Sequence, residues 1–320
     1  MNTDTSPDVS QVLHAPPVES TSDKATIITF WLLPFLGLIG TIVFQIHEGT
    51  IDWFYPGLFL GCYLVAGFGT TVFYHRYFTH ESFKALPIVE LLGGIAGSMA
   101  GQGKIQVWCS THGHHHQHSD QDDDPHSPWK YCIERHKISF GNLWLGFWHA
   151  QFGWMLQGIP LRNNAFYRRL SANPTVQFID RHLVLWILLG FLLPTLFGYL
   201  HEHTWKGALL GFLWGGAVRM FIHQHTTSLV NSYCHLFGTR PFKSKDYSTD
   251  SWLIALLALG EGFHNGHHVF PNSPLHGIHY RYLDLSYLFI RLLELFGLAK
   301  DVKKKIPSPE SVLRRQQVME

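Results

Sequence analysis

Four apolar segments constrain the fold of this 320-residue chain more than any other feature. A helix needs about 20 apolar residues, within a range of roughly 17–25, to cross the hydrocarbon core of a bilayer. Segments close to that length occupy 26–46, 53–74, 183–200 and 207–230. The third is short and contains Pro194, which a membrane helix tolerates when its neighbours satisfy the freed carbonyl. The pattern predicts an all-α integral membrane protein with four transmembrane helices.

The rest of the chain predicts one membrane domain with polar ends. Charged residues make up only 15% of the chain, whereas a soluble globular protein carries about 25%. We expect a disordered polar N-terminal tail at 1–25, a membrane domain at 26–306 and a polar C-terminal tail at 307–320. Three apolar stretches too short or too amphipathic to span are expected to lie at the interface or to pack: 86–100, 252–259 and 285–298. The four cysteines form no CxxC pair, which predicts reduced, buried thiols.

Basic residues predict the orientation of the four spans. The two short loops on one side, 47–52 and 201–206, contain a single basic residue, Lys206, whereas nearly all other lysines and arginines lie on the opposite side. By the positive-inside rule, both termini and the long segment 75–182 are expected to be cytoplasmic. This predicts a multi-pass protein of a bacterial inner membrane or the endoplasmic reticulum.

Histidines concentrate on the predicted cytoplasmic side. The chain has 23 histidines, and the clusters that follow the spans contain His75, His80, His112, His114, His115, His116, His118, His235, His264, His267 and His268. A lone histidine is more often a hydrogen-bonded packing residue than a ligand, but several clusters with matching spacing favour metal binding. Imidazole suits iron, copper, zinc and nickel.

The spacing within the clusters supports a shared site. Residues three and four apart share a helix face, so His112 with its partners at 115 and 116 can aim at a common point. The same holds for His264 with 267 and 268, and Asn231 lies four residues before His235. His75 and His80 are five apart, and therefore the helix is expected to end or distort there.

These residues resemble the membrane-bound stearoyl-type Δ9 acyl desaturases, the type 1 fatty acid desaturases. The matching strings are HRYFTH at 75–80, W-x3-H-x2-HH within WCSTHGHHHQHSD at 108–120, DPHSP at 124–128, NSYCHLFGTRPF at 231–242 and GEGFHNGHHVFP at 260–271. They occur in the family's order over about 27–298. The resemblance implies a cytoplasmic helical cap that carries a histidine-ligated di-iron site.

The resemblance also implies a ligand set for two iron ions. Its nine histidines are His75, His80, His112, His115, His116, His235, His264, His267 and His268. Asn231 would hold a metal through water. His114 and His118 are extra, and we interpret them as solvated or as hydrogen-bonded to ligands or nearby carboxylates. His149, His223 and His225 are not expected to be ligands.

Four further positions match residues that shape the family's acyl tunnel. Gln102, Trp108 and Thr227 would lie along a kinked tunnel beside the metals, and Tyr63 would close its far end. For each residue, the alternative is ordinary packing on an apolar helical face.

The expected reaction is O2-dependent desaturation of a saturated fatty acyl chain, which gives a cis double bond at Δ9. Breaking an unactivated C–H bond needs an oxidant that side chains cannot provide, so iron and O2 are the implied cofactor and co-substrate. HPGG and a GxGxxG motif after a strand are absent, and we expect a separate donor such as cytochrome b5 or ferredoxin. Membrane lipid is an expected partner and nucleic acid is not.

The acyl carrier and the competing functions stay open. Ser110 and Thr111 stand where animal relatives have an Arg-Asp pair that serves CoA, and Gly113 replaces an Arg. Acyl-CoA, acyl-carrier protein and acyl lipid are therefore all candidate substrates, and 131–142 looks like extra sequence. A related acyl hydroxylase, a desaturase of other regiochemistry and a histidine-rich metal transporter are the alternatives. A transporter would place its ligands near mid-membrane, and soluble acyl-carrier desaturases use carboxylate-rich helix bundles instead.

Overall fold

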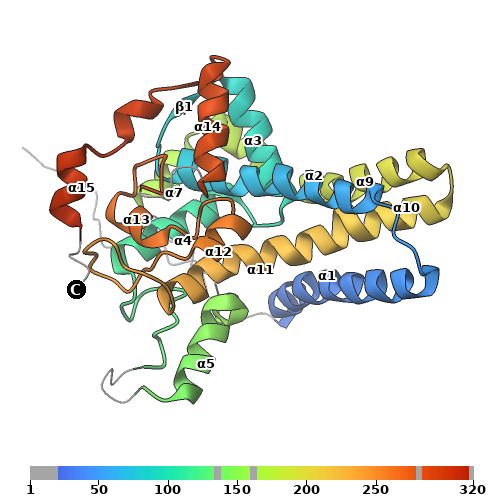
Figure 1. The fold of residues 1–320 in the computed structure, drawn as a ribbon, viewed down its shortest axis with the longest axis horizontal. Helices are drawn as coiled ribbons and strands as arrows, with labels where there is room; N and C mark the ends of the chain where they lie inside the picture. The colour runs from blue at the N-terminus through green and yellow to red at the C-terminus, as the bar shows by residue number, and fades with distance from the viewer. Residues whose placement is uncertain (1–20, 133–137, 159–163, 279–282, 317–320) are drawn as a thin grey trace, which may run out of the picture.

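Helices form almost all of the regular structure (Figure 1). The computed structural model describes residues 21–132, 138–158, 164–278 and 283–316. The longer helices are α1 (Thr21–Glu48), α2 (Phe54–Phe68), α3 (Pro87–Met99), α4 (Ile105–His118), α9 (Leu183–Glu202), α11 (Arg219–Ser232) and α14 (Leu285–Leu295). The shorter ones are α5 (Phe140–Trp148), α6 (Trp154–Leu156), α7 (Ala165–Ser171), α8 (Pro174–Arg181), α10 (Trp205–Gly211), α12 (Trp252–Leu257), α13 (His264–Val269) and α15 (Pro309–Arg315). Segments of π- or 3-10 helix are η1 (Gly69–Thr79), η2 (His149–Gly153), η3 (Phe212–Val218), η4 (Tyr233–His235) and η6 (Val302–Lys305).

Within the described residues, three helices are long and apolar enough to cross a membrane: Lys24–Glu48, Phe54–Thr79 and Leu183–Glu202. They coincide with the first three predicted spans. Leu33, Val43, Ile46 and Val184 on these helices are each at least 60% exposed, which is the surface that lipid would cover. The fourth predicted span corresponds to α10, η3 and α11 in succession, is less apolar than the other three, and stays a prediction.

Buried Arg219 shows how the long helices tolerate a charge. Its guanidinium donates to the carbonyls of Met99 and Gly190 at 2.9 Å each, and its Nε donates to the carbonyl of Gly215 at 3.2 Å. Arg219 is 1% exposed, so its side chain faces the interior of the helix bundle, as expected for an ionisable group in such a segment. Its hydrogen bonds link α3, α9 and the helix that carries it.

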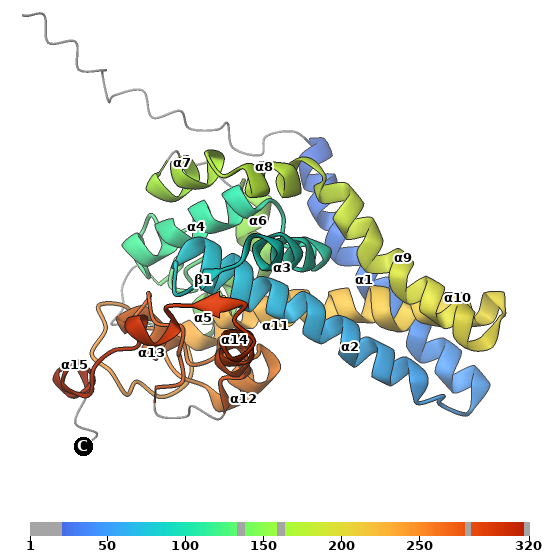
Figure 2. The same cartoon turned by 90° about the horizontal axis from the view of Figure 1, so that it is seen from above.

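An apolar core fixes the shorter helices against the end of α2 and η1. It includes Val72 and Phe78 from η1, Ile105 from α4, Ile179 from α8 and Ile290 from α14, all at most 4% exposed. Figure 2 shows α7 and α8 beside α4 on one side of this region and α13 on the other. The arrangement holds the histidine-bearing helices together.

The remaining expectations can be compared with the structure directly. The three shorter apolar stretches form α3, α12 and α14, and the four cysteines, all among the described residues, form no disulfide. Strands β1 (Lys84–Ala85) and β2 (Ala299–Lys300) pair antiparallel. The C-terminal stretch contains α15, and Lys243 N donates to the carbonyl of Arg315 at 2.8 Å. The N-terminal tail up to residue 20 and part of the predicted extra sequence, 133–137, lie outside the described residues.

Candidate metal centre

A π-helix brings the first histidine pair together. Segment η1 continues α2 with wider turns, and His80 N donates to the carbonyl of His75 at 3.1 Å, five residues back. The wider turn moves the two imidazoles onto one face, and their ring centroids are 4.9 Å apart. The expected distortion of the helix between these residues is confirmed.

Helices α4 and α13 each supply three of the predicted histidines, and 3-10 helix η4 supplies His235. All nine histidines come together, in two groups whose ligand atoms lie within 4.8 Å of one another. The first group is His75, His80, His112, His116 and His267. The second group is His115, His235, His264 and His268.

The division differs from the single common point that the spacing suggested. On α4, His112 and His116 join the first group, whereas His115 joins the second. Neighbouring residues of an α-helix point about 100° apart, since the helix has 3.6 residues per turn. Histidines at positions i and i+4 can therefore share an ion, whereas the histidine at i+3 turns toward a second one.

Distances between ring nitrogens match those of ligands that share a cation. In the first group, the Nε2 of His267 lies 3.0 Å from that of His75 and 2.9 Å from that of His116. In the second, the Nε2 of His264 lies 3.0 Å from those of His235 and His268. Two nitrogens bound to one ion at about 2.1 Å lie about 3.0–3.4 Å apart in octahedral or tetrahedral geometry.

Buried carboxylates hold four of the histidines from behind. The Nδ1 atoms of His75, His115, His235 and His268 contact Glu261 at 2.5 Å, Asp124 at 2.9 Å, Asp120 at 2.9 Å and Asp246 at 2.6 Å, respectively. A proton on each Nδ1 donates to the carboxylate and leaves Nε2 with a free lone pair. Carboxylates behind ligating histidines orient the rings and raise their basicity in metal sites.

The second group tests whether a metal ion fits. Three of its four histidines have their Nδ1 proton committed to a carboxylate, so three Nε2 lone pairs converge. Among the described residues, the buried Nδ1 of His264 has no hydrogen-bond partner. A single proton on His264 cannot satisfy three lone pairs at these separations, whereas one cation can bind all four nitrogens. The donor set therefore fits a divalent transition metal.

Protonation of the cluster favours metal binding as well. Burial, followed by the proximity of other histidines, lowers the pKa of His80, His112, His116, His264 and His267 well below its ordinary value. These imidazoles are neutral near pH 7, which is the form that binds a metal ion.

Two adjoining cavities lie beside the histidines. Tyr63 and Glu261 line the first, Gln102 lines the second, and Trp108 and Thr227 line both. All four predicted tunnel residues therefore border cavity space. Tyr63 is 8% exposed, and its hydroxyl lies 2.9 Å from the Thr226 hydroxyl and donates to the carbonyl of Leu257 at 2.6 Å.

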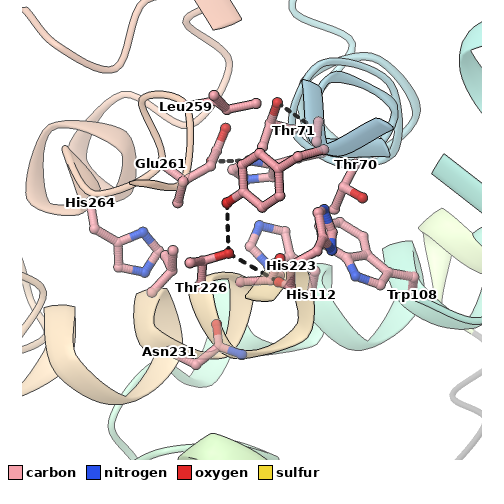
Figure 3. A pocket seen from close by; sticks show the side chains of 16 residues that line it. Thr70, Thr71, Trp108, His112, His223, Thr226, Asn231, Leu259, Glu261 and His264 are labelled. Carbon is pink, nitrogen blue, oxygen red and sulfur yellow. Dashed lines mark hydrogen bonds and ion pairs between the residues drawn. The ribbon is translucent and has the colours of Figure 1, made fainter. Parts of the chain in front are cut away.

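The cavities and the histidine groups meet at a common wall. Figure 3 shows His264 on one side of the first cavity and His112 with Trp108 on the other. Asn231, from the end of α11, lines both cavities. It therefore borders the same cavity as His112 and His264, and its role as a water-mediated ligand stays a prediction.

The carboxylates behind the rings are site residues that the sequence reasoning missed. Asp120 and Asp124 follow the second histidine cluster directly, and Glu261 lies three residues before His264, so their position in the motifs was an available signal. Asp246 lies in a loop between η4 and α12 with no comparable signal. Burial alone would raise the pKa of Asp124, but His115, His126 and the backbone N–H of Asp120 together outweigh this effect and hold the pKa below its ordinary value.

The other histidines that the sequence singled out lie outside the two groups. His223 Nδ1 lies 3.5 Å from Gln102 Nε2, and His225 Nδ1 lies 3.1 Å from Gln151 Nε2. His149 is buried in η2. His114 contacts the carboxylate of Asp123 at 2.9 Å, as expected for a histidine bonded to a nearby carboxylate.

The structure combines helices long enough to cross a membrane with a buried, histidine-rich potential metal site. These two features define the class as a membrane-type protein with a histidine cluster. Comparison with known proteins then gives the family. A family model described as fatty acid desaturase matches residues 52–288. The chain belongs to the fatty acid desaturase family, which makes it an oxidoreductase of lipid metabolism.

Similar proteins have different named activities. A hex-5-enoyl-(acyl-carrier protein) acetylenase of Moorena producens is 38% identical over 279 residues, which is 85% of this chain and 84% of that protein. An sn-1 stearoyl-lipid 9-desaturase of Anabaena variabilis is 34% identical over 89% of this chain and 97% of that protein. An acyl-CoA C20 Delta5-desaturase of Anemone leveillei is 34% identical over 91% of this chain and 88% of that protein.

Proposed function

We propose that the chain is an O2-dependent desaturase that introduces a cis double bond at Δ9 of a saturated fatty acyl chain. The observation that carries the proposal is the pair of histidine groups, five and four strong, beside a cavity lined by both groups. His75, His112 and His264 border that cavity directly. An acyl chain bound there would have its methylenes next to both groups.

Nine histidines and Asn231 would hold two iron ions, one in each group. When bound, the two ions would let O2 act as the oxidant. Two hydrogens from neighbouring methylenes, two electrons from an external donor and two protons would then reduce O2 to two waters. The protein would fix which methylenes react and their cis geometry by positioning the chain. Trp108 and Thr227 would guide the chain, Gln102 would line its entry, and Tyr63 would end the tunnel.

The position of the double bond is the finer part of the proposal. The Δ9 assignment is supported by the resemblance in the motifs and by the similarity to the stearoyl-lipid 9-desaturase. The acetylenase and the Delta5-desaturase have comparable identity, so the position has to be measured.

The acyl carrier has to be measured together with the position of the double bond. The names of the similar proteins refer to three different carriers, namely acyl-carrier protein, lipid and CoA. Ser110 and Thr111, in place of the Arg-Asp pair, are 1% and 9% exposed.

We also propose four spans, with both termini and the metal groups in the cytoplasm. The support is that His75 lies near the end of the second candidate span and Asn231 near the end of α11. Figure 1 shows the histidine-bearing helices α4 and α13 at this same end of α2 and α11. A separate donor, such as cytochrome b5 or ferredoxin, would deliver electrons from that side.

The test combines metal analysis with product analysis. Protein purified with its native metal is expected to contain two iron atoms per chain. His267→Ala removes a member of the first group and His268→Ala a member of the second, and each is expected to leave about one atom or fewer. His182→Ala, a half-buried histidine outside both groups, serves as the matched control. Unchanged iron in the two ligand variants would refute the ligand set.

Expression in a desaturase-deficient host tests the reaction. New monounsaturated chains with the double bond at Δ9 are expected from the parent and not from His267→Ala. Extracts supplied in parallel with acyl-CoA, acyl-carrier protein or lipid substrates identify the carrier. Hydroxylated chains, or no product despite good expression and a working donor, would overturn the proposed reaction.

A further inference from the structure

Three further clusters of histidine and carboxylate side chains lie near the two groups. Two of them, His75–Glu261–His276 and His115–Asp124–His126, share a histidine with the candidate metal centre and belong to it. The remaining cluster is His114, His118 and Asp123, which shares no residue with either group. It uses the two extra histidines that the family resemblance leaves without a role.

Helix geometry directs this cluster away from the metal centre. His114 and His118 are four residues apart on α4 and therefore share one face, with ring centroids 4.3 Å apart. His112 is two residues from His114, about 200° around the helix, and so faces the opposite direction. Carboxylates of the loop after α4 contact histidines on both sides of the helix. Asp124 contacts His115 of the metal centre, whereas Asp123 contacts His114.

The ligand atoms of the cluster are close enough for side-chain movements to bring them to one ion. They lie within 4.8 Å of one another, and the Nε2 of His114 lies 2.9 Å from both the carboxylate and the backbone carbonyl of Asp123. Two ligand atoms bound to one ion at about 2.1 Å lie about 3.0–3.4 Å apart, so metal binding requires His114 to exchange its contact with the carbonyl for the ion and His118 to move closer. His118 is half-buried at the helix end, where it can make that movement.

We propose that His114, His118 and Asp123 form a separate site for one divalent transition-metal ion, such as Zn2+. Two imidazoles and one carboxylate are ligands that these ions accept, and water completes the coordination. Asp123 has a side chain 53% exposed, so the ion exchanges with solvent, unlike an ion held in the buried groups. The site is independent of the acyl chemistry.

Zn2+ binding to the iron-loaded, detergent-purified protein tests the proposal after removal of any affinity tag. Zn2+ is titrated against a competing fluorescent chelator, and zinc and iron are both counted by mass spectrometry after gel filtration. One additional Zn2+ per chain is expected, with the iron content unchanged. The matched variants are His118→Gln and Asp123→Asn, which change exposed or half-buried side chains, with His182→Gln as the control histidine.

Each ligand variant is expected to weaken Zn2+ binding by more than the roughly 10–100-fold that loss of an outer partner costs at a metal site. The control is expected to bind like the parent. Equal Zn2+ binding by the parent and both ligand variants would overturn the site, as would the lack of a saturable additional equivalent in the parent. Loss of iron on Zn2+ addition, equal in parent and variants, would place the Zn2+ in the histidine groups and also overturn it.

Discussion

Asp124→Asn changes the site by a single atom in a place where both oxygens of the side chain are in use. Oδ1 accepts from the N–H of His126 at 3.1 Å, and Oδ2 accepts from the N–H of Asp120 at 2.8 Å. His115 Nδ1 lies 3.0 Å from Oδ1 and 2.9 Å from Oδ2. The amide of an asparagine has one acceptor, so its NH2 group must face one of the two backbone N–H groups in either orientation.

Two effects of known size follow from this geometry. A buried N–H left without an acceptor costs about 1–3 kcal/mol of folding free energy. Loss of the negative charge behind His115 weakens a metal ligand, and changes of this kind cost about 10–100-fold in metal affinity. Asp124 is ionised at neutral pH, because its pKa is held below the ordinary value, so the variant removes a full charge.

Iron retention and thermal stability test this reasoning together. Parent and Asp124→Asn protein are dialysed against increasing chelator, and the variant is expected to lose iron at a chelator concentration about 10–100-fold lower. Asp122→Asn makes the same chemical change two residues away on an exposed side chain, and is expected to match the parent. An Asp124→Asn protein with the iron retention and melting temperature of the parent would refute the argument.

Three further predictions concern the cavity, the helix packing and the pH response. Tyr63→Ala removes a cavity-lining side chain that hydrogen-bonds Thr226 and that we propose ends the tunnel, and is expected to shift the products toward longer acyl chains; an unchanged chain-length profile by gas chromatography would contradict this. Gly69→Ala places a methyl group 2.1 Å from the backbone N of Gly97 and is expected to cost about 1–3 kcal/mol in a thermal melt, whereas Gly61→Ala, which meets nothing within 4 Å, is expected to be neutral. Burial raises the pKa of Asp250 from 3.8 to about 7, so the folded state binds its proton more tightly and loses as much as about 4 kcal/mol as the pH rises from about 4 to 7. Asp250→Asn is expected to melt with less pH dependence over this range, and parallel curves would count against it.

Spacing could predict that the histidines lie close together, because it is a local property of helices. It did not predict their division, since residues 112, 115 and 116 were expected to aim at a common point and instead join two groups. The five-residue step from His75 to His80 requires a distorted helix. Local sequence does not show how the fourth predicted span accommodates buried Arg219. Carbonyls from two other helices accept its hydrogen bonds, and no local pattern reveals them. Hydropathy measures composition, whereas this segment depends on tertiary hydrogen bonds.

The carboxylates mark the limit of what spacing can predict. Asp120 and Asp124 both lie in the loop after α4, yet they hold histidines from different elements, His235 and His115. A loop has no fixed period, so the partner of each carboxylate depends on how α4 and η4 pack.

The division of the nine histidines follows from one property of the helix applied twice. On α4 the histidines at i and i+4 join the five-membered group and the one at i+3 joins the four-membered group. On α13 the assignment is reversed, since His264 and His268 belong to the four-membered group and His267 to the other. Each of these two helices lies between the groups, since the residues at i+3 and i+4 point about 100° apart around the helix. Two such helices facing each other therefore specify a pair of sites, and each centre takes three histidines from them. His75 and His80 complete the first, whereas His235 alone is added to the second, and Asn231 borders the cavity beside them, where we propose that the acyl chain binds.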